Sequence, residues 1–160
     1  MKIFLSIFIS LVIGFLVGCL FTVVILSKDI YLKQNKANKF FALYMLMYQW
    51  VQIKQNHLCI ENFFLEKGYR CIAIYGMNFV GQSLFKELID SNVNVKYAID
   101  QRADGLSAEI PIVFPDYNFP EVDVIVVTPI IEFGSIEKRL MKKINCPIVS
   151  IEEVIMSINK

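Results

Sequence analysis

The feature that most constrains this chain is an uncharged apolar run near its start. Residues Ile3–Leu26 are 24 consecutive positions without a charged side chain. As a helix rising ~1.5 Å per residue, the run is about 36 Å long, enough to cross a ~30 Å hydrocarbon core with some tilt. The sequence therefore predicts a transmembrane anchor over residues 1–27, amphipathic connecting helices over 28–67 and a folded domain over 68–160.

The charges beside this run predict its orientation. One lysine precedes it, whereas several follow it closely: Lys28, Lys33, Lys36 and Lys39. Positive charge gathers on the cytoplasmic side of membrane helices. We therefore expect a single-pass protein of the cell membrane with its domain in the cytoplasm.

The apolar run has two other possible interpretations, a cleaved signal peptide and a lipoprotein signal. A cleaved signal peptide has a shorter apolar core and a small-residue cleavage site, and neither is present. Leu16–Cys19 resembles a lipoprotein box with Cys19 as the lipidated residue, but Leu20–Leu26 continues the apolar run where a lipoprotein turns polar. The length of the run favours the membrane span.

Small residues recur at every fourth position of the predicted span. They are Ser6, Ser10, Gly14, Gly18 and Thr22. This spacing aligns them on one stripe, and Gly14 and Gly18 form a GxxxG motif, which lets membrane helices pack closely. The stripe predicts a homo-oligomer, although small residues are also common in membrane helices that do not pair.

The segment from Asp29 to about Gln55 has no Pro or Gly and is expected to be helical. Its apolar side chains recur at steps of three and four, as in an amphipathic helix. They are Phe40, Leu43, Tyr44, Met47, Trp50 and Val51. Such a face lies on the membrane surface, pairs with a second copy or packs on the domain. A shorter helix is predicted over His57–Lys67, with Gly68 as its C-terminal cap.

Charge and cysteine content exclude two classes of function. Residues 57–160 carry ten Lys/Arg and fourteen Asp/Glu, which gives about −4 (10 − 14). Nucleic-acid binding needs a basic surface, so no nucleic-acid partner is expected. The four cysteines form no CxxC pair, and the chain has one histidine, so no metal site is expected.

The domain begins with a strand–helix–strand pattern. Cys71–Tyr75 is an apolar strand, Gly76–Gly81 opens a helix, and Val95–Ile99 is the next strand, ending at Asp100. Dinucleotide sites use this layout, with a tight glycine turn, a helix N-terminus facing the phosphates and an acid that binds the ribose. Asn78 stands where the middle glycine of that fingerprint is expected, and it either weakens phosphate contact or donates its amide to the phosphate.

The rest of the domain predicts an α/β fold, a small Rossmann-like parallel sheet of four to five strands with flanking helices. Ile110–Val113, Val122–Thr128 and Cys146–Val149 are the further strands, and Ser135–Lys143 is an amphipathic helix. Ligands of parallel sheets bind beyond the carboxyl ends of the strands. The residues expected to bind a cofactor there are Gly76, Met77, Asn78, Gly81, Asp100, Thr128 and Pro129.

Three segments carry a resemblance to a known group of domains: Ile72–Met77, Val95–Asp100 and Val122–Pro129. The stretch that contains them, from about Lys39 to Ile155, resembles the small Rossmann-like domains of bacterial surface-polysaccharide biosynthesis proteins. Such domains form the front of sugar acyltransferases and the nicotinamide-binding halves of nucleotide-sugar epimerases and dehydratases. The resemblance implies NAD(P) or a nucleotide sugar as ligand and polysaccharide-synthesis enzymes as partners.

The domain lacks the groups that catalysis by itself would need. No tyrosine has a lysine four positions later, and the only histidine, His57, precedes the domain. The acids Asp100, Asp104 and Glu132 could line a pocket, although loop carboxylates are usually solvated. No self-sufficient enzyme is therefore expected. Three hypotheses follow: a membrane-tethered nucleotide-binding module, a subunit whose catalytic residues come from a partner, or a scaffold that no longer binds.

Overall fold

A computed structural model describes residues 2–103, 109–116 and 119–158, with side chains from Gly14 onward. The chain divides into two compact units, Met1–Phe41 and Ala42–Lys160. Each is considered separately below.

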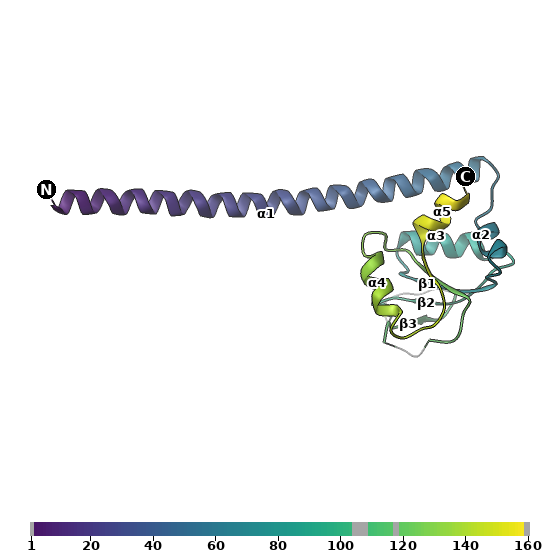
Figure 1. Ribbon diagram of the computed structural model, residues 1–160. Helices are drawn as coiled ribbons and strands as arrows, with labels where there is room; N and C mark the ends of the chain where they lie inside the picture. Colours follow the sequence, from purple (N-terminus) through teal and green to yellow (C-terminus); the bar gives the residue numbers. More distant parts are fainter. Residues whose placement is uncertain (1, 104–108, 117–118, 159–160) are drawn as a thin grey trace. The chain divides into compact units, whose positions relative to one another are not determined.

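The first unit consists of the greater part of one helix. Helix α1 runs without a break over Lys2–Gln55, so the predicted anchor and the predicted connecting helix are one element (Figure 1). Over Gly14–Gln55 this helix is long and apolar enough to cross a membrane. Among the described residues, this is the one candidate membrane span, and it lies near the N-terminus. Gly14, Gly18 and Thr22 are exposed on it, whereas the side chains of Ser6 and Ser10 lie outside the described ones.

The second unit is an α/β domain built on a five-stranded parallel sheet, as the sequence predicts. Its strands are β1 (Cys71–Tyr75), β2 (Asn94–Ile99), β3 (Ile112–Val113), β4 (Val124–Val127) and β5 (Ile148–Ser150). They lie in the order β3-β2-β1-β4-β5. This is the order of the first five strands of the Rossmann plan, with the change of direction between β1 and β4.

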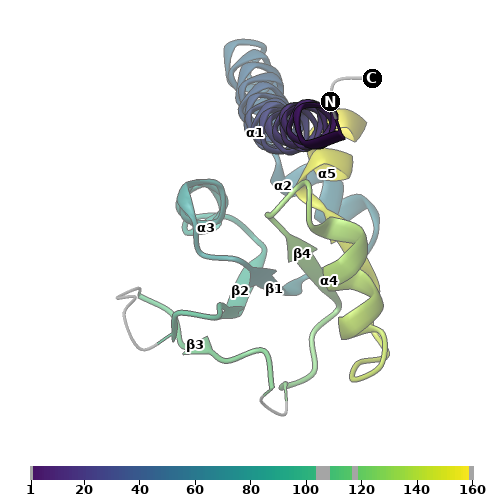
Figure 2. The same cartoon turned by 90° about the vertical axis from the view of Figure 1, so that its left-hand side faces the viewer.

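Helices cover both faces of this sheet. They are α2 (Glu61–Glu66), α3 (Phe79–Leu88), α4 (Phe133–Leu140) and α5 (Ile151–Ile158). Figure 2 shows α3 and α4 on opposite sides of the strands. The larger core holds α2, α3, α5 and the end of α1 against one face, and the smaller core packs α4 against the other. Because both faces are covered, all four residues of β4 are buried, which explains its continuous apolar sequence.

The end of α1 belongs to the domain. Leu46, Trp50 and Ile53 are at most 5% exposed and join the larger core. The sequence left three environments open for this amphipathic helix: the membrane surface, a second copy or the domain. The structure shows that the side of α1 with these three residues packs on the domain.

The short helix after α1 begins later than predicted. α1 ends at Gln55, and His57 has φ 55°, in the left-handed region that interrupts a helix. The next helix therefore starts at Glu61 rather than at His57. Gly68, with φ 76°, lies just after it, as expected for a left-handed cap.

Candidate functional site at the carboxyl edge of the sheet

The strand register brings the predicted site residues to one edge. Tyr75 pairs with Ile99 of β2 and with Val127 of β4. The residues that follow these three in sequence, Gly76, Asp100 and Thr128, therefore leave the sheet at the same level. They flank the position where the strand order reverses, which is where open α/β sheets bind ligands.

Gly76 makes the tight turn that the fingerprint requires. Its φ is 93°, and a Cβ at this position would lie 2.8 Å from Thr128 Oγ1 and 2.9 Å from Pro129 Cδ. Any side chain would thus be strained and would collide with the β4 end. The Thr128 hydroxyl donates to the Gly76 carbonyl at 2.7 Å, which joins the loop after β1 to the loop after β4.

Gly81 allows α3 to approach this turn closely. A Cβ on Gly81 would lie 2.0 Å from the carbonyl oxygen of Gly76. The last glycine of the dinucleotide fingerprint has this role of close packing between helix and strand. The first and last glycines of the predicted motif therefore have the local geometry expected of them.

Asn78 caps α3 with its own side chain. Its Oδ1 accepts hydrogen bonds from the N–H groups of Val80 at 2.9 Å and Gly81 at 3.2 Å. These are the donors that a helix N-terminus otherwise offers to an anion. The side-chain oxygen of Asn78 therefore already accepts from these two donors within the protein.

Asp100 fixes the same loop from the neighbouring strand. Its side chain is 8% exposed, and Oδ2 accepts from the Met77 N–H at 2.8 Å. Oδ1 accepts from the Arg102 N–H at 2.9 Å. Because each carboxylate oxygen has two acceptor positions, Asp100 retains capacity for a ribose hydroxyl.

Two residues of this edge were not among the predicted site residues. Phe79, the first residue of α3, is 86% exposed although it is a large apolar side chain. Gln82 Nε2 donates to the Met77 carbonyl at 3.1 Å. An exposed aromatic ring next to the motif could have suggested Phe79 from sequence, whereas nothing in the sequence indicates the contact of Gln82.

The other predicted acids are Asp104 and Glu132, of which the structure describes Glu132. Glu132 directly precedes α4, where its carbonyl accepts from the Ser135 N–H at 3.1 Å. Asp104 lies outside the described residues. Within those residues, no group of three or more His, Cys, Asp and Glu side chains could hold a metal ion.

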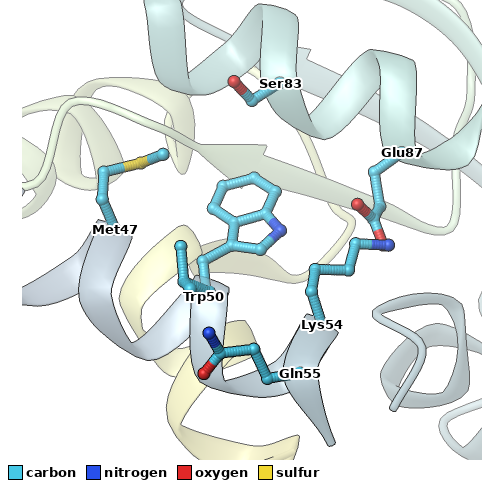
Figure 3. Close-up of a pocket in the computed structure, with 7 residues that line it drawn as sticks. Met47, Trp50, Lys54, Gln55, Ser83 and Glu87 are labelled. Atoms are coloured by element: carbon cyan, nitrogen blue, oxygen red, sulfur yellow. The ribbon is translucent and has the colours of Figure 1, made fainter. Parts of the chain in front are cut away.

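Two cavities of the domain lie away from the predicted residues. One, of about 390 Å³, lies between the end of α1 and α3 (Figure 3). The other, of about 690 Å³, lies at the amino ends of the strands, and its lining includes Tyr97, Phe119 and Asp123. The second was not predicted, because loops distant in sequence form it.

At the amino edge of the sheet, burial and backbone hydrogen-bond donors shift the pKa values of three side chains. Burial raises the pKa of Tyr97 to about 12, and the Cys146 and Cys71 thiols add to the rise. The N–H groups of Cys71 and Arg70 donate to the Asp123 carboxylate and lower its pKa. Burial raises the pKa of the Cys146 thiol, so this cysteine is a poor nucleophile at neutral pH.

The chain was compared with known protein families, curated proteins and solved structures. No family model, no curated protein and no solved structure matches the chain.

Proposed function

We propose that this chain is a membrane-anchored module that binds a nucleotide, NAD(P) or a nucleotide sugar, at the carboxyl edge of its sheet. In this proposal the domain faces the cytoplasm and has an accessory role beside the enzymes of surface-polysaccharide synthesis. The ligand class and the pathway come from the resemblance of its strand and loop sequences to such domains.

One observation carries the ligand site. Gly76 turns at φ 93° between the β4 end and the Gly81 end of α3, at the reversal of strand order. Such a turn directs the backbone toward a bound pyrophosphate. Asp100 lies at the tip of the adjacent strand, where it can accept from ribose hydroxyls, and Phe79 offers an exposed ring for stacking against a base.

The Asn78 cap sets the strength of binding. A phosphate can reach the N–H groups of Val80 and Gly81 only when the Asn78 side chain rotates away. The ligand then exchanges one set of hydrogen bonds for another, so its net gain is small. Asn78→Gly removes this competitor and is expected to tighten binding by about tenfold, the equivalent of one hydrogen bond.

Calorimetric titration of the full chain in detergent tests the proposal. The ligands are NAD(H), NADP(H) and UDP-sugars, and the proteins are wild type, Asn78→Gly and Asp100→Asn. Saturable binding that Asn78→Gly strengthens and Asp100→Asn weakens is the expected result. Asp90→Asn, a change at an exposed acid after α3, is the matched control. Absence of binding by folded wild type and folded Asn78→Gly would overturn the proposal.

A scaffold without a nucleotide is the second candidate function. It is favoured by the same loop, because Asn78 and Asp100 accept from the N–H groups of Met77, Val80 and Gly81 within the protein itself. In that case Asn78→Gly lowers stability, since the cap is lost, and creates no affinity. The titrations above separate the two functions.

Labelling of Cys59 tests the cytoplasmic location. Cys59 is exposed in the loop between α1 and α2. A membrane-impermeant maleimide added to intact cells should leave it unlabelled, and permeabilised cells should label it. Cys59→Ser is the control for reaction at the other cysteines. Equal labelling of Cys59 in intact and permeabilised cells would place the domain outside.

A further inference from the structure

The end of α1 has apolar side chains on two sides, and only one side is covered. Leu46, Trp50 and Ile53 are buried in the domain core. Tyr44 and Val51, on the other side, are 62% and 47% exposed. An exposed apolar surface of this kind marks a contact with another molecule.

The exposed residues have the spacing of a coiled coil. Tyr44, Met47 and Val51, which we call the seam, follow one another at steps of three and four, and in sequence Phe40 precedes Tyr44 by four. Alternating steps of three and four keep side chains facing a parallel partner helix. Tyr48 flanks the seam, with its ring stacked on Tyr44 at a centroid distance of 6.5 Å.

A groove adjoins the seam. Met47 and Val51 of the seam also line the cavity of about 390 Å³. Figure 3 shows Trp50 in this cavity, with Ser83 on α3 across from it. Lys54 lies three positions after Val51, the last residue of the seam, and forms an ion pair with Glu87 of α3. The charge that follows the seam is thus compensated within its own chain.

Charge indicates which molecule covers this surface. No charged residue occurs between Phe40 and Ile53. Helices that lie on a membrane surface usually carry Lys or Arg on their polar face to attract anionic lipids. Two identical surfaces, in contrast, repel one another when they are charged and associate when they are neutral and apolar. The neutral segment therefore suits a second copy of itself.

The position of the seam on the same helix as the candidate span also favours a second copy as the partner. Because α1 carries both the span and the seam, two copies in one membrane insert in the same direction and present the same residues at the same level. A symmetric dimer requires this self-matching geometry.

We propose that the seam of Tyr44, Met47 and Val51 pairs with the seam of a second copy as a parallel, in-register coiled coil. The partner's Tyr48 and seam side chains cover the groove beside Trp50. This interface follows the predicted anchor of residues 1–27 along α1 and differs from the small-residue stripe, and it holds whether or not the domain binds a nucleotide.

Cysteine cross-linking of the full chain in liposomes tests the pairing. Cys19 and Cys59, the exposed cysteines, are first replaced by serine. Val51→Cys is then compared with Met45→Cys, a 37% exposed position on a different side of α1. Oxidation should join Val51→Cys copies roughly tenfold more than Met45→Cys copies, because a disulfide needs Cα atoms within about 7 Å.

A second measurement uses two differently tagged full chains. Tyr44→Glu with Val51→Glu should reduce their co-purification by roughly tenfold or more, because the carboxylates would be buried without partners. Met45→Glu should leave co-purification unchanged. Both seam positions are exposed in the single chain, so thermal unfolding of the domain should not change.

Three results would overturn the pairing. The first is equal cross-linking of the Val51→Cys and Met45→Cys proteins. The second is the absence of a cross-link in folded protein. The third is quenching of a fluorophore at position 51 by brominated lipid without cross-linking, which would assign the seam to the membrane surface.

Discussion

The Asp100 carboxylate accepts a hydrogen bond from the Met77 N–H at 2.8 Å, across 23 positions of sequence. This bond connects the end of β2 to the turn after β1. It gives the carboxylate a structural task in addition to the proposed contact with ribose.

Asp100→Asn should lower the free energy of unfolding by about 1–3 kcal/mol, because the buried N–H group of Met77 and the N–H group of Arg102 lose a charged acceptor. Urea unfolding followed by circular dichroism measures the change. Asp90→Asn, at an exposed acid, should stay within about 0.5 kcal/mol of wild type. Equal stability of all three proteins would show that this hydrogen bond contributes nothing net.

Alanine at the two site glycines should be destabilising for different reasons. Gly76→Ala meets Thr128 and Pro129 at a positive φ and should cost at least about 2 kcal/mol. Gly81→Ala places a methyl group against the Gly76 carbonyl and should cost about 3 kcal/mol or more.

Gly134→Ala in α4 is the matched control for both glycine variants. A Cβ there has no atom within 4 Å, so stability should be unchanged or rise by up to about 1 kcal/mol. Thermal melts of the three variants give the ranking. A Gly76→Ala protein as stable as Gly134→Ala would contradict the close contact with the β4 end.

Trp50→Ala should show that the end of α1 is part of the domain. Trp50 is 5% exposed in the larger core, so truncation should cost about 3–5 kcal/mol. Tyr48→Ala, two positions earlier and 51% exposed, should cost less than about 1 kcal/mol in the unpaired chain. Guanidinium unfolding of the monomeric protein in detergent measures both changes in stability. A small effect of Trp50→Ala would mean that the end of α1 does not pack on the domain.

Alkaline pH should weaken the domain through Tyr97. Its pKa is raised from 10.0 to about 12, so the neutral phenol is favoured in the folded state. This contribution to stability is complete below pH 10 and is lost as the pH rises toward 12, with a slope of at most about 1.4 kcal/mol per pH unit. Tyr97→Phe should remove that slope and also the hydrogen bond to the Pro120 carbonyl.

Urea unfolding of wild type and Tyr97→Phe between pH 9 and 11.5 measures the difference in slope. Tyr48→Phe, at an exposed tyrosine, controls for the loss of a hydroxyl and should follow wild type. Parallel pH profiles of wild type and Tyr97→Phe would contradict the assigned effect of burial.

Features that depend on residues close together in the sequence could be predicted from the sequence. The strand Cys71–Tyr75 has the predicted bounds, because an apolar run followed by glycine specifies a buried strand and its end. The glycine turn, the start of α3 and the uncharged run in α1 are likewise local patterns. Covered faces on both sides explain why β4 could be recognised as a strand buried in a parallel sheet.

Contacts between distant segments were decided by the tertiary structure. The apolar side chains of α1 all fit one helical period, so spacing could not separate buried Trp50 from exposed Tyr44; the packing of α2, α3 and α5 did so. The sequence likewise placed Asn78, Asp100 and Thr128 at strand ends. Only the pairing of β1 with both β2 and β4 brought Asp100 onto Met77 and Thr128 onto Gly76, because hydrogen bonds across a sheet depend on strand order and register.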